Sequence, residues 1–147
     1  MTIRFAETDE EILNCFEVVQ ALRPHVTDPA AFLQQVREMK LEGYRMLYCG
    51  VNEGGKEKAA AFVGFRPLYK LFSGRSIYID DLSTLPAYRG RGYGGQLLDH
   101  VHRIAKETGK AVVDLDSGFQ RHDAHRLYLN KGYTLSCHHF TFRVPGE

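Results

Sequence analysis

The chain has 147 residues, of which 44% are apolar and 25% are charged, and these proportions are typical of one soluble globular domain with a single core. The formal net charge of +1 and the lack of any apolar run near the roughly 20 residues of a membrane span argue against a nucleic-acid-binding protein and against a membrane protein. Cys15, Cys49 and Cys137 are odd in number and far apart, which argues against a disulfide framework, and the first residues lack the form of a signal peptide, so we expect a cytoplasmic protein.

The N-terminal third predicts a short strand and two helices. Thr8 and Glu11 have the spacing of a capping box, so we expect the first helix to begin there and to end at Pro24. Asp28 before Pro29 has the form of an N-cap followed by proline in the first turn, so a second helix should begin at that point. Each helix carries apolar residues at helical spacing, which gives it one face for the core.

The middle of the chain predicts a hairpin, a loop and a third strand. Residues 44–51 and 59–65 are rich in strand-forming residues, and the glycines between them are typical of a hairpin turn. Residues 67–75 are expected to form a loop, whose apolar side chains could either line a pocket or fold onto the edge of the core. Residues 76–84 predict another strand.

The last part of the chain predicts a helix, a strand, a second helix and a final strand. After a glycine-rich stretch, apolar residues at helical spacing predict an amphipathic helix that Gly109 ends. Residues 111–115 predict a short apolar strand, residues 123–131 a helix, and residues 133–144 a strand in which apolar residues alternate. This order of elements predicts an α/β fold with a mixed sheet, a single domain over residues 1–147.

Arginines alternate with glycines between the strand at residues 76–84 and the helix that follows. Glycine lets the backbone turn sharply and lets a ligand approach its N–H groups closely. The start of a helix adds free N–H donors and a partial positive charge. This combination predicts an anion site, most often one for phosphate. The residues of the stretch are Arg89, Gly90, Arg91, Gly92, Tyr93, Gly94 and Gly95.

Two motifs of the chain resemble those of the GCN5-related N-acetyltransferases, the GNAT family. The first motif is Arg/Gln-x-x-Gly-x-Gly/Ala after a strand and a proline, which stands here as Arg89–Gly94 after Pro86. The second is a short helix that ends in a tyrosine and precedes a Gly-aromatic pair, which stands here as Tyr128 followed by Gly132 and Tyr133. The order of the predicted elements agrees with the family as well, so the resemblance covers nearly the whole chain.

The resemblance implies a GNAT-like fold: a central, mostly antiparallel mixed sheet that is splayed at its middle, with helices on both faces. It implies acetyl-CoA as cosubstrate, with the pyrophosphate on the glycine stretch and the pantetheine arm along the strand edge at Leu82, Ser83 and Thr84. Ser117 could bond to pantetheine or to a reacting group, or it could serve a turn. Arg121 stands where many members have asparagine, and it could reach a CoA phosphate or the acceptor.

Tyr128 and two adjacent acidic residues are the candidates for catalysis. By the resemblance, Tyr128 is the general acid that protonates the leaving CoA thiolate. The stretch around Asp80 and Asp81 is similar to the acidic strand of polyamine acetyltransferases, which implies that Asp80 is the base and Asp81 the recognition group for a small cationic amine. Neighbours on a strand face opposite sides, so both carboxylates can serve one site only if a bulge breaks the alternation.

The expected function is acetyl transfer to an amine by direct attack, and three alternatives stay open. A protein or peptide acceptor would need a long open groove. An acyl-CoA-binding module without turnover would need neither Tyr128 nor the acidic strand. Gly90-x-Gly92-x-x-Gly95 also fits a dinucleotide fingerprint, although arginines are out of place in a loop that closes tightly on a dinucleotide. We expect no metal ion and no nucleic-acid or membrane partner, whereas a homodimer is compatible with the sequence.

Overall fold

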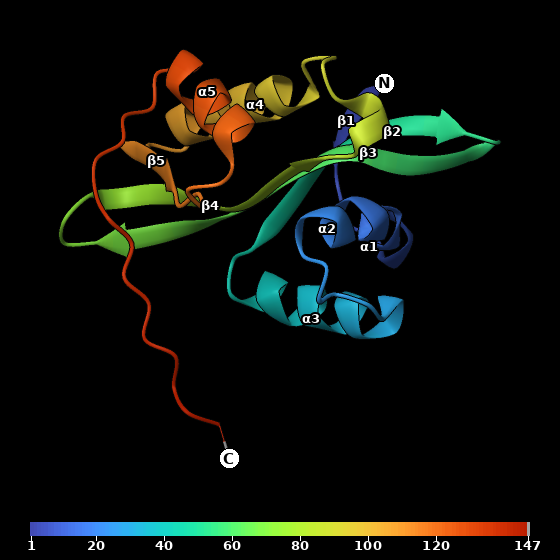
Figure 1. Cartoon of the computed structure of the whole chain (residues 1–147), viewed down its shortest axis with the longest axis horizontal. Coiled ribbons are helices and arrows are strands. Elements are labelled where there is room, and N and C mark those ends of the chain that lie inside the picture. Colours follow the sequence, from blue (N-terminus) through green and yellow to red (C-terminus); the bar gives the residue numbers. More distant parts are fainter. Residues whose placement is uncertain (147) are drawn as a thin grey trace. The chain divides into compact units, whose positions relative to one another are not determined.

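The computed structural model describes residues 1–146, which form two compact units, residues 1–115 and residues 116–146 (Figure 1). The elements of the first unit are β1 (Thr2–Phe5), α1 (Asp9–Asn14), α2 (Phe16–Leu22), α3 (Pro29–Leu41), β2 (Arg45–Glu53), β3 (Lys56–Lys70), β4 (Gly74–Thr84), the short 3₁₀ helix η1 (Pro86–Tyr88), α4 (Tyr93–Glu107) and β5 (Val112–Leu115). The second unit contains α5 (His122–Asn130) and an extended segment after it.

Within residues 1–115, five strands form one mixed sheet in the order β1-β2-β3-β4-β5. Neighbouring strands are antiparallel except for β4 and β5, which pair in parallel through Ser76–Ile79 and Val112–Leu115. β5 ends there, whereas β4 continues to Thr84, with β3 as its one strand partner in the described sheet. The expected mixed, mostly antiparallel sheet is confirmed, and β4 has an open edge over residues 80–84.

Helices lie on both faces of this sheet, as expected (Figure 1). α1, α2 and α3 cover one face, and α4 lies on the other against β2, β3 and β4. The buried side of α4 is its predicted apolar stripe, which includes Leu97, Leu98, Val101 and Ala105. Among the helices described for residues 1–146, none is long and apolar enough to cross a membrane.

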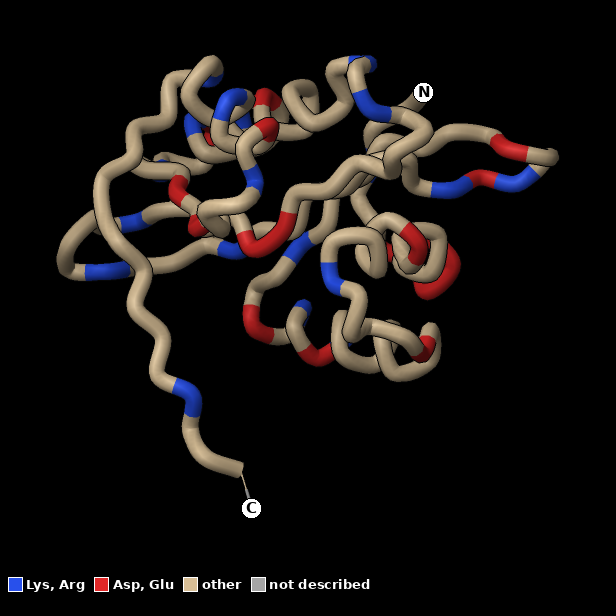
Figure 2. The backbone as a smooth tube through the Cα atoms, in the orientation of Figure 1, with Lys and Arg blue, Asp and Glu red and all other residues tan. Residues whose placement is uncertain are grey.

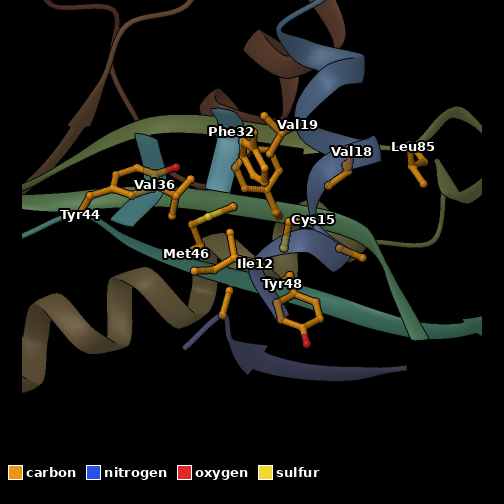
Figure 3. Packing of buried hydrophobic residues seen from close by; sticks show 13 residues of the cluster. Ile12, Cys15, Val18, Val19, Phe32, Val36, Tyr44, Met46, Tyr48 and Leu85 are labelled. Carbon is orange, nitrogen blue, oxygen red and sulfur yellow. The ribbon is translucent and has the colours of Figure 1, made fainter. Parts of the chain in front are cut away.

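The core of the first unit lies between the sheet and α1–α3 (Figure 3). Ile12 of α1, Val18 of α2 and Phe32 of α3 belong to one buried cluster. Met46 and Tyr48 of β2 complete its centre. Burial of each such large apolar side chain contributes about 1.5–3 kcal/mol to folding. This cluster holds α2 against the sheet, and so fixes where the end of α2 meets β4.

Both predicted helix starts are confirmed, but the first helix is not continuous. The Thr8 hydroxyl accepts a hydrogen bond from the Glu11 N–H at 3.1 Å, and the Glu11 carboxylate accepts one from the Thr8 N–H at 2.9 Å. Asp28 caps α3 by accepting from the Ala30 N–H at 3.2 Å. The prediction of a single helix up to Pro24 was wrong at Cys15, which is both the C-cap of α1 and the N-cap of α2 and so separates the two helices.

The expected loop at residues 67–75 is a strand over most of its length. β3 continues through Pro67 to Lys70 and pairs with the start of β4, so the turn is confined to residues 71–73. The β2–β3 ladder ends at Phe65, so Pro67 lies where β3 has one neighbour in the described sheet. Proline is tolerated at such an edge because its missing N–H is not needed for a second ladder.

The expected final strand at residues 133–144 does not form among the described residues, and the chain from residue 133 to residue 146 is extended without a β-ladder. Its apolar residues do alternate, but Phe140, Phe142 and Val144 are all exposed. Alternation shows which side chains would share one face of a sheet, whereas a strand also needs a neighbouring strand to bond with. The prediction was wrong because that neighbour is lacking here.

Candidate active site

A β-bulge in β4 lies at the acidic pair. Asp81 lies opposite Gly64 of β3 and Ile79 lies opposite Phe65, so Asp80 has no counterpart and is the extra residue of the bulge. The alternation of side chains along β4 is therefore broken between the two carboxylates. The bulge that a shared role for both carboxylates requires is present.

Both carboxylates belong to one connected group of side chains. Arg66 of β3 pairs with Asp80, and Tyr44, just before β2, donates its hydroxyl proton to Asp81. The guanidinium carbon of Arg66 lies 5.3 Å from the centre of the Tyr44 ring. Arg23, just after α2, bonds to the carboxylate of Asp81 and to the backbone carbonyl of Asp80. The acidic pair thus faces the side of the sheet that α1–α3 cover.

Asp80 is a mostly buried carboxylate held in a two-pronged ion pair. Nε and Nη2 of Arg66 donate to its two oxygens at distances from 2.7 to 3.1 Å. Its side chain is 19% exposed. Burial raises the pKa of Asp80 above its usual value, and the opposing effect of Arg66 is smaller. A raised pKa makes Asp80 a stronger base than an ordinary aspartate.

Asp81 accepts two hydrogen bonds, forms an ion pair with Arg23 and is fixed in place. Arg23 donates from Nε at 3.0 Å, its Nη2 lies 2.8 Å from the same carboxylate oxygen, and the Tyr44 hydroxyl donates at 3.2 Å. Burial and the nearby carboxylates raise the pKa of Tyr44 well above its usual value, so Tyr44 stays a neutral donor. Tyr44 has room because Gly64 has no side chain: a Cβ at Gly64 would overlap the Tyr44 hydroxyl. These contacts suit a positioning or recognition role.

The glycine stretch forms a sharp turn into α4. Gly90 and Gly92 have φ values of 79° and 80°, in the left-handed region that favours glycine. Gly92 is the N-cap of α4 and brings no side-chain hydrogen bond. The N–H groups of Tyr93, Gly94 and Gly95 are in the first turn, where no intrahelical acceptor is available. A Cβ at Gly90 or Gly92 would meet no atom within 4 Å, so this backbone faces open space that a ligand can enter.

Basic and aromatic side chains flank this turn. Figure 2 shows basic positions in the segment just before α4. The guanidinium carbon of Arg91 lies 5.0 Å from the centre of the Tyr88 ring, and that ring stacks on Tyr93 with centroids 6.5 Å apart. The Tyr88 hydroxyl donates to Glu53 at 2.7 Å, which ties η1 to the end of β2. Positive charge, free N–H groups and the helix dipole together make this turn suited to a phosphate group.

The edge of β4 next to this turn is open. Leu82, Ser83 and Thr84 pair with β3 on one side, and no described strand pairs with them on the other. Their backbone N–H and C=O groups on that side are available to a peptide-like ligand. This is the geometry that the predicted pantetheine contact requires.

Three predicted site residues lie in the second unit. Tyr128 is in α5, and its ring centroid lies 5.7 Å from that of Tyr133. Burial raises the pKa of Tyr128, against a smaller opposing effect of Arg121, the residue just before α5. The Ser117 hydroxyl has no hydrogen-bond partner among the described residues. The roles of Tyr128, Ser117 and Arg121 stay predictions that rest on the motif.

Sequence analysis did not find Arg23, Tyr44 and Arg66. Each comes from a different element, and strand register and helix packing bring all three to the acidic pair. Local sequence carries no signal for such contacts between distant segments. Within residues 1–146, no three His, Cys, Asp or Glu side chains come together as a metal-binding group.

Comparison with known proteins defines the class. The family model described as "Acetyltransferase (GNAT) family" matches residues 8–133. An uncharacterized N-acetyltransferase of Bacillus subtilis, YhdJ, is 32% identical over 138 residues, which cover 92% of each chain. The aminoalkylphosphonate N-acetyltransferase of Salmonella typhimurium is 40% identical over 63 residues, which cover 43% of this chain and 41% of that protein.

A crystal structure of a probable acetyltransferase has the same fold, with a TM-score of 0.81 and 14% identity, and the match covers 100% of both chains. Together with the sequence matches, this makes the protein an acetyltransferase. The chain belongs to the GNAT family.

Proposed function

We propose that this protein moves the acetyl group of acetyl-CoA to the amino group of a small molecule, by direct attack of the amine on the thioester. The single observation that carries the proposal is the bulge, because it places Asp80, a carboxylate of raised pKa, beside the open edge of β4. One relative is named for its action on an aminoalkylphosphonate, which is a small amine.

The proposal assigns the glycine stretch and the β4 edge to acetyl-CoA. The N–H groups of Tyr93, Gly94 and Gly95 would hold the pyrophosphate, with Arg89 and Arg91 adding charge. Pantetheine amides would pair with the backbone of residues 82–84. Two observations support this assignment. The space beside Gly90 and Gly92 is empty because neither residue has a side chain, and no described strand pairs with residues 82–84 on the side away from β3.

Asp80 would act on the amine. A primary amine with a pKa of about 10.4 is almost fully protonated at pH 7, and holding it neutral costs about 4.6 kcal/mol. Asp80 would take a proton from the ammonium and pass it to solvent, which frees the lone pair for attack. The C–N bond then forms and the C–S bond breaks, and the new amide nitrogen loses its second proton.

Tyr128 would supply the proton that the leaving thiolate needs. Its raised pKa means that the phenol keeps its proton at neutral pH until the thiolate forms. Even for an unperturbed phenol of pKa about 10, proton transfer to a thiolate whose acid has a pKa of about 8.5 is uphill by about 2 kcal/mol, and the raised pKa of Tyr128 adds to this difference. Desolvation of the thiolate in the same site would reduce this difference. The second proton lost by the nitrogen would restore the phenol.

An acceptor screen with thiol release as the readout tests the proposal. Acetyl-CoA is offered with amino acids, aminoalkylphosphonates, polyamines, aminoglycosides and peptides. Release of thiol together with a mass increase of one acetyl group on an amine supports the proposal. Binding of acetyl-CoA without turnover of any acceptor would instead favour a binding module, and turnover of peptides alone would favour a protein acetyltransferase.

A further inference from the structure

The acidic pair is not an open anionic pocket, because two arginines pair with it. Arg66 pairs with Asp80 and Arg23 pairs with Asp81, so two negative charges meet two positive charges. An acceptor that brought only positive charge would approach two guanidinium groups as well as two carboxylates. The balance of charge therefore does not favour a purely cationic molecule.

Each arginine is held through the Nε and Nη2 edge of its guanidinium group, and the remaining N–H donors are not used in these contacts. Arg23 uses Nε and Nη2 for Asp81 and for the backbone carbonyl of Asp80, and its Nη1 has no partner among the described residues. Its side chain is 42% exposed, so the free end is accessible. Arg66 also uses Nε and Nη2, but it lies over the Tyr44 ring and is only 22% exposed. Arg23 is therefore the better placed of the two to meet a ligand.

A guanidinium that is already held by a carboxylate is a preorganised anion site. Little side-chain entropy is lost when its remaining N–H groups bind a carboxylate or phosphonate, and a charge-assisted hydrogen bond forms. Arg23 reaches both the Asp80 carbonyl at 3.1 Å and the Asp81 carboxylate. Arg23 therefore contacts both residues of the acidic pair, so a guanidinium group lies beside the residue that is proposed to act on the amine.

We infer that the acceptor is an amine that also carries an acid group, and that Arg23 selects it by binding that group. The inference rests on the proposed acetyltransferase function and narrows its substrate class. The acid group is a carboxylate or a phosphonate, because both match the donors of a guanidinium. Amines without an acid group, polyamines included, should be poor acceptors.

Matched acceptors test the inference in the wild-type chain. β-Alanine and 3-aminopropylphosphonate are compared with propylamine and 1,3-diaminopropane at fixed acetyl-CoA. We expect kcat/KM to be at least tenfold higher for one of the acidic amines than for the other two acceptors. The better of the two acidic amines identifies the acid group. Equal or higher kcat/KM for propylamine or the diamine would overturn the inference while leaving the acetyltransferase function intact.

Arg23→Gln tests the residue. The variant should lose at least tenfold more in kcat/KM for the acidic amine than for propylamine, and the extra loss should come mainly through KM. Arg37→Gln is the control, because Arg37 is also a half-exposed arginine paired with an aspartate, Asp9, but lies on α3 away from the acidic pair. Arg23→Lys keeps the positive charge but lacks the planar guanidinium edge, so its kcat/KM for the acidic amine should lie between those of the wild type and Arg23→Gln.

Binding gives a second readout that needs no turnover. Calorimetry with the acidic amine and CoA should show weaker binding in Arg23→Gln than in wild type, at unchanged affinity for acetyl-CoA. Equal loss for every acceptor, or no loss for any, would rule out a selective role for Arg23. A chain that acetylates none of the four acceptors and binds no acidic amine would contradict both the inference and the proposed function.

Discussion

Among single residues, Asp80 shows how burial and ion pairing compete at one carboxylate. Arg66 alone would make it a weaker base, but burial has the larger effect and raises its pKa. The adjacent acidic residues are visible in the sequence, and so is their likeness to a known acidic strand. The bulge is not, because it depends on how the lengths of β3 and β4 match across the ladder. The partners Tyr44 and Arg66 depend on strand register, and Arg23 depends on the packing of α2 against the sheet.

Asp80→Asn should lower kcat by about 10²–10⁴-fold, the usual contribution of a general base. In the wild-type chain, kcat/KM should rise with pH as Asp80 loses its proton, with a midpoint above the ordinary aspartate pKa of about 3.9, because burial raises the pKa. The variant has no such group, so this rise should disappear from its pH–rate profile. If Asp81→Asn abolishes the rise and Asp80→Asn does not, the two roles are reversed.

Tyr128→Phe should lower kcat by about 10²-fold or more while the affinity for acetyl-CoA stays the same. The ring that packs near Tyr133 is kept, and only the proton donor is lost. Steady-state kinetics and calorimetry measure the two quantities separately. Tyr133→Phe is the matched control, and it should leave kcat nearly unchanged. Unchanged turnover in Tyr128→Phe would remove Tyr128 from the mechanism.

At the level of elements, the caps, turns and amphipathic stripes were predictable because their signals are local. Thr8, Asp28 and Gly109 specify helix ends through their own side chains or φ angles. The strand through Pro67 and the missing strand at residues 133–144 were not predictable. Whether an extended segment becomes a strand is decided by its neighbours in space.

Gly92→Ala should weaken acetyl-CoA binding at least tenfold and destabilise the fold by about 1–2 kcal/mol. The φ of 80° strains any residue with a Cβ, and the new methyl group would enter the open space where the phosphate is proposed to bind. Gly54→Ala is a close control, because Gly54 has a φ of 61° and open space as well, but lies in the β2–β3 turn. Urea denaturation should show similar losses for both variants, and calorimetry should show weaker acetyl-CoA binding for Gly92→Ala alone. Equal acetyl-CoA affinity in both would argue against the phosphate site.

For the molecule as a whole, the order of elements and two motifs predicted the family and the mixed sheet. The chain matches the GNAT family over residues 8–133. The sheet has the expected mixture of antiparallel pairs and one parallel pair. The prediction of a single domain over 1–147 stays a prediction, as do cytoplasmic location and a homodimer. Charge totals gave no hint of the acceptor, because the arginines and aspartates near the site cancel in the sum.

Acetyl-CoA should raise the melting temperature of the chain, and NADH should not. A ligand at 100 times its Kd stabilises the folded state by about 2.7 kcal/mol, which corresponds to about 5–10 °C for a chain of this size. Thermal melting with each nucleotide at matched concentration measures the shift. A shift with NADH alone would revive the dinucleotide alternative.

The bulge also bears on how such a site can be gained or lost. Ile79 and Asp81 already lie opposite consecutive residues of β3. Removal of Asp80 would therefore leave a regular ladder in which the residues on either side still face the same sides of the sheet. A change of three nucleotides is then enough to add or delete the proposed base while the sheet keeps its register. For protein engineers, deletion of Asp80 would remove the proposed base without a shift of the ladder, and insertion of one acidic residue at a regular ladder would be the reverse change.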